Sequence, residues 1–241
     1  MLFLILTVPM SLVWQQVSPS VDFRQFGVRI QEVQGRLWQG QALASVHNQP
    51  VLLNWSMRLS GLVQGHLPIN FELESSAGDM LADLNLGLTE IELVVPRMEL
   101  ALKGLNPALR QQRLELDGEL QAQGLRVVLR DGRPEFAEGR LAWSGGDIAY
   151  PAGRAKHERT MPAFQGSLTT TEQGEIKLDI RDLSAQFSVI EALLTDDGVG
   201  LVQVRRRLLD LANEPWAVNS DEQDVVFKIK KPLFSAGSQH G

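Results

Sequence analysis

Apolar and polar residues alternate over much of this chain, and this period of two constrains the fold more than any other feature. From residue 84 to residue 102 nearly every second residue is apolar, and the phase slips at Thr89–Glu90 and again at Pro96–Arg97. Alternation sends successive side chains to opposite faces of a strand, as in a half-buried sheet. The phase slips predict turns or β-bulges between or within strands.

The same alternation recurs at residues 114–120, 125–129 and 176–180. Asp131–Gly132 lies between two strand-like segments, Leu125–Arg130 and Phe136–Trp143. Asp-Gly supplies the positive φ angles of a tight turn, so this stretch predicts a β-hairpin, with a register that Pro134 leaves open. We therefore expect a mainly β fold: an antiparallel meander of hairpins forming a curved or groove-like sheet.

A glycine–leucine phrase recurs along the chain and has two interpretations. Its copies are Gly35–Gly40, Gly61–Gly65, Gly118–Gly124, Gly139–Gly146 and Gly166–Gly174. The phrase either marks a structural repeat of hairpins about two strands long or reflects the ordinary use of glycine at turns and bulges. Both interpretations favour the same meander.

Helical signals are few. Phe187–Leu194 and Arg205–Asn213 each place apolar residues on one side of a helix, although either segment could instead be a strand. Residues 225–229 are strand-like, and residues 235–241 are predicted to form a flexible tail.

The first residues, Met1–Trp14, contain no charged side chain, and the first ionisable side chain is Asp22. The run could be a signal peptide, a buried core element or a membrane anchor. It has neither the basic front nor the cleavage site of a signal peptide. Trp14 suits a membrane interface, and membranes tolerate a kink at Pro9. We favour a transmembrane anchor over residues 1–17, short enough to leave a truncated start open, followed by a β domain over residues 18–234.

Composition narrows the function. The 23 Lys and Arg residues against 29 Asp and Glu give a net charge of −6, which does not favour a nucleic-acid partner. The chain has no cysteine, so disulfides, thiolate metal sites and a cysteine nucleophile are excluded.

No motif for catalysis, metal binding or a cofactor is recognisable. His47, His66, His157 and His240 lack partners at metal-ligand spacing, and there is no nucleophile elbow or phosphate-binding loop. The acidic cluster at residues 221–224 could hold a cation but is better explained as a solvated turn. The basic run at residues 205–207 could meet acidic lipid headgroups or form an exposed helix edge. We predict no catalytic, cofactor or metal-binding residue and no enzyme, and a hydrolase would require an exposed, hydrogen-bonded Ser–His or carboxylate pair.

Two phrases carry a family resemblance. Val33–Ala42, following the N-terminal apolar run, and Gly139–Gly146, followed by Asp147–Pro151, resemble the type II secretion system protein N family, as do the length and the order of elements. The family usually carries a basic residue before its membrane helix, which this sequence lacks. The positions that define the resemblance, interpreted as framework rather than ligand-binding residues, are Gly35, Leu37, Trp38, Gly40, Gly139, Trp143 and Gly146.

The resemblance implies a non-enzymatic accessory component of type II secretion. It implies a single-pass protein of the bacterial inner membrane, with most of the chain in the periplasm. Its partners would be other inner-membrane platform subunits or secretin subunits. The family is also similar to envelope proteins with open β sheets that contact lipid, so a periplasmic lipid-binding or lipid-transfer protein is the alternative. Alternating strands fit both, because alternation does not tell whether protein or lipid meets the apolar face.

Overall fold

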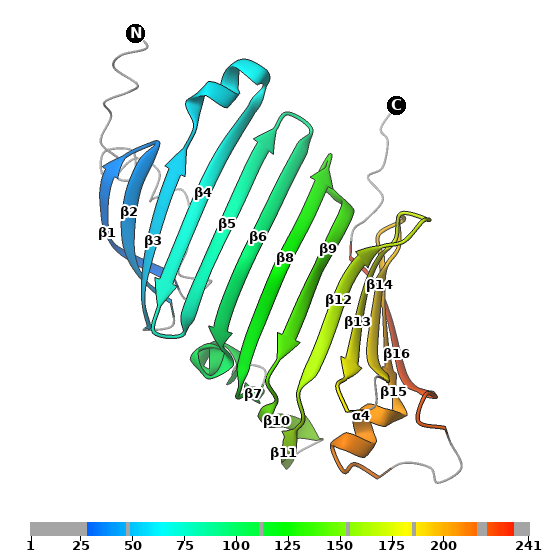
Figure 1. Ribbon diagram of the computed structural model, residues 1–241. Helices are drawn as coiled ribbons and strands as arrows, with labels where there is room; N and C mark the ends of the chain where they lie inside the picture. The colour runs from blue at the N-terminus through cyan, green and yellow to red at the C-terminus, as the bar shows by residue number, and fades with distance from the viewer. Residues whose placement is uncertain are drawn as a thin grey trace.

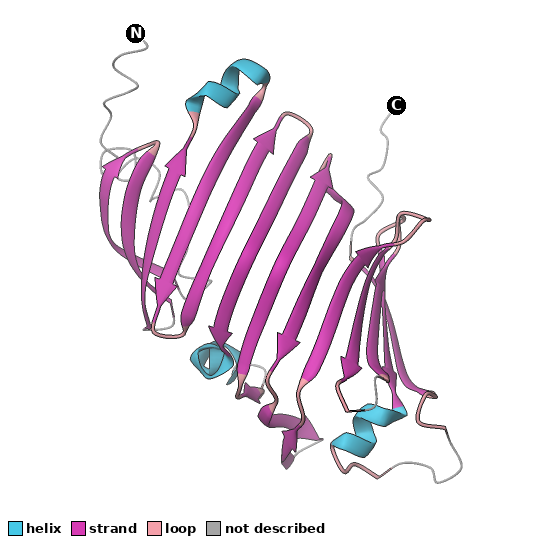
Figure 2. Ribbon diagram, in the orientation of Figure 1, coloured by secondary structure: helices cyan, strands magenta, loops and turns pink. Residues whose placement is uncertain are grey.

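The computed structural model describes residues 28–46, 49–110, 113–152, 155–184, 187–215 and 221–233. These residues form a 13-stranded sheet and a 3-stranded sheet, both antiparallel where strands pair. Figure 2 shows that strands make up nearly all of the described chain. The predicted mainly β meander is therefore confirmed, and the large sheet stays open because β1 and β16 lie at its two edges.

The large sheet follows chain order except where other elements interrupt it (Figure 1). Its strands are β1 (Val28–Arg36), β2 (Gln39–Val46), β3 (Gln49–Met57), β4 (His66–Ser75), β5 (Gly78–Gly87), β6 (Glu90–Ala101), β8 (Glu119–Arg130), β9 (Arg133–Trp143), β12 (Phe164–Thr170), β13 (Ile176–Asp182), β14 (Ser188–Leu194), β15 (Val199–Arg205) and β16 (Val225–Pro232).

The small sheet and the helices lie at the ends of these strands. The small sheet has the order β11-β10-β7, from β7 (Glu115–Leu116), β10 (Gly146–Ala152) and β11 (Ala155–Met161). The short helices are η3 (Leu59–Gln64), η4 (Leu102–Leu105), α3 (Asn106–Leu109) and α4 (Arg206–Leu211). Figure 1 shows η3 at one end of the strands and the small sheet, η4, α3 and α4 at the opposite end.

Local sequence explains where strands turn and bulge. Asp131 and Gly132 both have positive φ, 50° and 75°, as a type I′ hairpin turn requires, so the predicted hairpin is confirmed. Thr89 lies in the turn between β5 and β6. The second phase slip is a bulge, because Leu81 pairs with Arg97 whereas Asp83 pairs with Val94. Proline lacks the N–H that a regular ladder needs, which suits Pro96 to that bulge.

Three sequence expectations need separate comment. The helix considered over Phe187–Leu194 is wrong, because Ser188–Leu194 is β14, which pairs with β13 and β15. The second helical segment contains α4. The anchor at residues 1–17 and the tail at residues 235–241 lie outside the described residues. In the part of the chain that is described, no helix is both long and apolar enough to span a membrane.

The register separates two faces of the large sheet. On one face, the row of neighbouring residues Ala42, Leu53, Leu73 and Met80 crosses β2 to β5. The adjacent row, one residue further along each strand, lies on the other face and is mostly polar, with Gln41, Asn54 and Glu72 among its members. The faces are called the apolar face and the polar face below.

Close packing on the apolar face depends on glycine at one crossing. Gly40 pairs with Trp55, whose ring lies over it and is buried. A Cβ atom built on Gly40 would lie 2.4 Å from the Gln34 carbonyl oxygen and 2.5 Å from Trp55 Cζ2, so the backbone of β1 and the ring together occupy the space that any larger residue needs. The indole N–H of Trp55 donates to the carbonyl of Leu37, 3.0 Å away, which fixes the ring over β2.

We expect Gly40→Ala to lower the free energy of unfolding by about 2 kcal/mol, because overpacking of this kind costs roughly 1–3 kcal/mol. Gly166→Ala is the matched control, because its Cβ would approach Leu141 Cβ at 3.3 Å and Leu178 Cδ1 at 3.6 Å. Denaturant unfolding followed by tryptophan fluorescence measures both. Equal losses in the two variants would contradict the role given to Trp55.

Candidate binding face

The apolar face is continuous from β3 to β9. Its only side-chain polar atom over this stretch, apart from the strand ends, is the indole nitrogen of Trp55, which is already bonded within the chain. The register brings together on this face Leu53, Trp55, Ile69, Phe71, Leu73, Met80, Ala82, Leu84, Leu93, Val95, Met98, Leu100, Leu120, Ala122, Leu125, Val127, Ala137 and Leu141.

This face is wide for an uncovered surface. The strands β3, β4, β5, β6, β8 and β9 are spaced about 4.8 Å apart and extend about 25 Å, which gives on the order of 700 Å². The largest apolar patch on a typical soluble monomer is roughly 300–600 Å². Figure 1 shows β3 to β8 as a single layer among the described residues. Large side chains such as Leu84, Leu93 and Leu125 accordingly remain half-buried.

One end of the apolar face is covered. The small sheet and α4 contribute Met161 and Ala212 to a core with Phe164 and Val189, against which Leu208 and Leu211 also pack. Trp143 stacks on Phe164 at a centroid distance of 5.7 Å. We call these covering elements, β7, β10, β11 and α4, the floor, because they close the strand ends from β9 to β15.

A single carboxylate fastens the segment after α4 to the small sheet. Glu214 Oε1 accepts from the Tyr150 hydroxyl at 2.6 Å and lies 2.9 Å from both His157 Nδ1 and Arg159 Nη2. The Tyr150 hydrogen bond, followed by that of His157, lowers the pKa of Glu214 against the opposing effect of burial. Arg159 Nε also donates to the carbonyl of Ala212 at 2.7 Å.

A buried ion pair fastens α4 to the large sheet. Asp182, at the end of β13, is 0% exposed and accepts from Arg207 Nη2 at 2.7 Å and Nε at 3.0 Å. Ser184 adds its backbone N–H at 2.9 Å and its hydroxyl at 2.8 Å. Burial, the largest single influence, would raise the pKa of Asp182, but these hydrogen bonds and the Arg207 charge together lower it.

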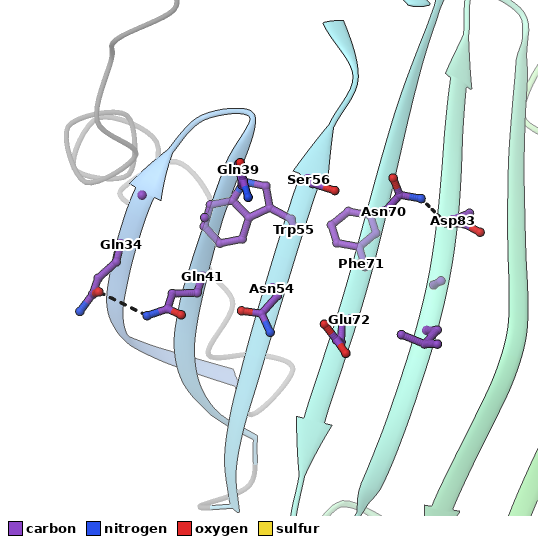
Figure 3. A pocket seen from close by; sticks show the side chains of 14 residues that line it. Gln34, Gln39, Gln41, Asn54, Trp55, Ser56, Asn70, Phe71, Glu72 and Asp83 are labelled. Atoms are coloured by element: carbon purple, nitrogen blue, oxygen red, sulfur yellow. Dashed lines mark hydrogen bonds between the residues drawn. The ribbon is translucent and has the colours of Figure 1, made fainter.

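The polar face carries a hollow over β1 to β5 (Figure 3). It measures about 680 Å³ and is lined by amide, hydroxyl and carboxyl side chains and by the apolar residues Trp55, Phe71, Leu81 and Ala82. Gln41 donates to Gln34 at 3.3 Å, and Asn70 donates to Asp83. Because its lining is largely half-exposed, the hollow offers hydrogen bonds to solvent but no desolvated centre.

The first resemblance phrase lies at the β1–β2 turn. Gly35 has φ 95°, where a Cβ would meet the Gln39 carbonyl oxygen at 2.6 Å. The carbonyl of Leu37 accepts from Trp55, and that of Trp38 accepts from the Met57 N–H at 2.6 Å. The phrase thus joins β1, β2 and β3 through backbone contacts.

The second phrase lies where β9 leaves the large sheet for the floor. Gly139 lies against Leu125, and Gly146 lies against the backbone of Asp117. The indole N–H of Trp143 donates to the Asp117 carbonyl at 2.9 Å. The other copies of the glycine–leucine phrase fall in η3 and along β8 and β12, so they do not occupy equivalent positions. The framework role of these residues stays a prediction.

The charged runs noted in the sequence meet each other. Arg207 pairs with Asp182 and lies 3.6 Å from Glu222 in the acidic cluster. Arg205 donates to the carbonyl of Gln223 at 2.8 Å. These arginines therefore hold the chain around α4.

Within the described ranges, no three His, Asp or Glu side chains are grouped to hold a metal ion. The ring of His157 faces Glu214 rather than a serine, with Nδ1 2.9 Å from Oε1. This arrangement does not provide the Ser–His pair on which the hydrolase alternative depends.

The described residues thus define a mainly β protein with an open antiparallel sheet and one wide apolar face. Residues 26–220 match the family described as type II secretion system (T2SS), protein N. The chain therefore belongs to the type II secretion system protein N family, as the resemblance predicted.

One curated relative is the type II secretion system protein N of Vibrio cholerae serotype O1 (strain ATCC 39315 / El Tor Inaba N16961). The two proteins are 31% identical over 160 residues, which cover 62% of this chain and 62% of the relative. The match thus spans less than two thirds of the length of that relative. No solved structure matches the chain significantly.

We expect Asp182→Asn to lower the free energy of unfolding near pH 7 by about 3 kcal/mol, because it leaves the largely buried Arg207 charge with only the more distant and more exposed Glu222 as a partner. A lowered folded-state pKa stabilises the protein above the unfolded value of about 3.9 and loses that contribution as pH falls through the folded value. The variant should therefore show a smaller loss of stability below pH 4 than the wild type.

Denaturant unfolding between pH 3 and pH 7 measures both effects. Asp196→Asn, in the exposed turn between β14 and β15, is the control and should change neither the stability nor its pH dependence. A wild-type pH profile in the Asp182→Asn variant would contradict the assignment.

Proposed function

We propose that the chain acts in type II secretion as a membrane-anchored adaptor. In this proposal Met1–Trp14 holds it in the bacterial inner membrane, and the large sheet lies in the periplasm. There it contacts other inner-membrane platform subunits or the secretin. Family membership supports the secretion role, and the uncharged N-terminal run supports the anchor.

The observation that carries the adaptor role is the exposed edge strand β16. It pairs with β15 on one side and has no neighbouring strand on the other among the described residues. Phe227 and Ile229, on the apolar face of β16, are 50% and 61% exposed. An edge strand offers unpaired N–H and C=O groups to an extended segment of a partner, while its side chains select that segment.

The charge of β16 indicates which kind of partner segment can pair with it. Lys228 and Lys230 project to the polar face and, among the described residues, form no ion pair. Two copies of β16 would bring like charges together, which disfavours self-pairing. A partner strand with acidic residues on one face and apolar residues on the other complements β16.

We expect the double variant Lys228→Glu and Lys230→Glu to reduce cross-linking to other secretion subunits several-fold. The measurement places a photo-crosslinking residue at Ile229 in cells that carry the secretion machinery and identifies the adducts by mass spectrometry. Lys103→Glu, an exposed position in η4, is the matched control and should leave the adducts unchanged. Undiminished adducts in the double variant would overturn the docking edge.

A second candidate function is the binding of lipid acyl chains on the apolar face. Lipid binding requires that no second layer of protein covers this face. Among the described residues, no such layer packs over β3 to β8. Protein interfaces carry about one hydrogen bond per 100–200 Å². A face on the order of 700 Å² would then need several. The side chains of the apolar face offer no hydrogen bonds. The face therefore suits hydrocarbon better than a protein partner.

We expect a phospholipid with a photoactivatable acyl chain to label peptides of β6 and β8 in the full-length protein. Leu93→Asp, on the apolar face, should reduce labelling several-fold because a carboxylate in hydrocarbon is strongly disfavoured. Its neighbour Val94→Asp, on the polar face, is the control and should label as the wild type does. Equal labelling in both variants would contradict lipid binding on this face.

A further inference from the structure

Three of the most exposed large apolar side chains lie at one end of the strands. Val63 is 91% exposed, Leu88 is 94% exposed and Leu62 is 57% exposed. Leu62 and Val63 belong to η3, which joins β3 to β4, and Leu88 belongs to the turn between β5 and β6. We call this end of the strands, opposite the floor, the open edge.

The register places the end of η3 next to the β5–β6 turn. His66 pairs with Gly87, so the residues immediately beyond them, Gly65 and Leu88, extend side by side past the end of the ladder. Gly65 adopts φ 80° as it ends η3, which lets the helix turn back over β4. Figure 1 shows η3 and the β5–β6 turn projecting from the same end of the sheet.

We call the exposed side chains of Val63 and Leu88 the tips. Basic and aromatic residues lie at the same end of the strands as the tips. Arg36 ends β1 and Arg58 precedes η3, and both are exposed and form no ion pair among the described residues. Trp38 lies in the β1–β2 turn at this edge. Farther along the open edge, the turn between β14 and β15 carries Asp196 and Asp197 instead. Over β1 to β6 the open edge thus combines exposed apolar side chains with two arginines, and the carboxylate nearest to Leu88 in the sequence, that of Glu90, is paired with Arg130.

We propose that the part of the open edge over β1 to β6 seats on the surface of an anionic lipid bilayer. The apolar side chains Val63 and Leu88 are more than nine-tenths exposed and belong to two different turns of the chain. A fluid bilayer can surround each of them, while cations attract its headgroups and a tryptophan ring suits its interface. This proposal is independent of the adaptor role and of any contact made by β16.

The seating has a structural consequence for the apolar face. The floor closes the far end of the apolar face. At the open edge, no described element covers the ends of β5, β6 and β8. Ile91, near that end of the apolar face, is 37% exposed. A bilayer against the open edge would therefore lie next to the uncovered end of the apolar face rather than next to the floor.

The test uses the absence of native cysteine to place one fluorophore at a time on the full-length chain. Val63→Cys and Leu88→Cys report on the tips. Ser76→Cys reports on the opposite end of the strands, and Glu172→Cys reports on the β12–β13 turn of the open edge. Each labelled protein is reconstituted in vesicles of phosphatidylethanolamine and phosphatidylglycerol, with and without phospholipids that carry a quencher on the acyl chain.

We expect a blue-shifted emission and at least threefold stronger quenching at Val63→Cys and Leu88→Cys than at the two reference positions. Because every variant keeps the N-terminal run, tethering alone would not produce this difference. Quenching at the tips that is no greater than at Ser76→Cys would overturn the proposal. So would a tip that becomes shielded only when other secretion subunits are added, because that result identifies a protein partner.

A second variant tests the chemistry of the tips. Val63→Asp should reduce quenching of the fluorophore at Leu88→Cys at least twofold, because a charged tip is excluded from hydrocarbon. Leu183→Asp replaces a leucine that is 40% exposed at the opposite end of the strands and is the matched control. If both substitutions reduce quenching equally, or neither does, the contact is not made by these tips and the proposal fails.

Discussion

The ladder of backbone hydrogen bonds between neighbouring antiparallel strands is the interaction on which the rest of the structure depends. Each inner strand of the large sheet satisfies its N–H and C=O groups through the strands on both sides, so the sheet can extend without a second layer. Side chains then divide strictly between two faces. A single layer cannot bury its apolar side chains fully, and this explains why so few large side chains are completely enclosed: Val189 and Asp182 are the largest of the described ones.

The exceptions to the single layer occur at the floor. Val189 and Asp182, both 0% exposed, lie near the ends of β13 and β14, where α4 and the small sheet provide a second layer. Two carboxylates fix that layer: Asp182 binds α4 through Arg207, and Glu214 binds the small sheet through Tyr150, His157 and Arg159. A few desolvated or partly desolvated polar contacts thus hold the floor against a sheet that is otherwise held by its backbone.

Sequence reasoning predicted what local chemistry determines. The Asp131–Gly132 turn and the irregularity at Pro96 follow from φ preference and from a missing N–H, and both occur as expected. It left residues 188–194 open between a helix and a strand, because Val189 and Ile190 suit either until the neighbours β13 and β15 are known. It could not find the Glu214 cluster, because Glu214 is 57 residues from His157. Alternation also establishes two faces without indicating whether another layer covers either one.

The surfaces that remain open divide the possible contacts by their chemistry. The apolar face has no side-chain hydrogen bonds to offer, β16 has backbone groups and lysines to offer, and the tips at Val63 and Leu88 have apolar side chains that project singly. A hydrocarbon chain, an extended acidic segment and a bilayer surface respectively complement these features. Because β16 is the last strand and the tips lie over β3 to β6, the strand order separates the two contacts across the width of the sheet. Under the two proposals the chain can meet a protein partner and a lipid surface at the same time, since neither contact requires the groups used by the other.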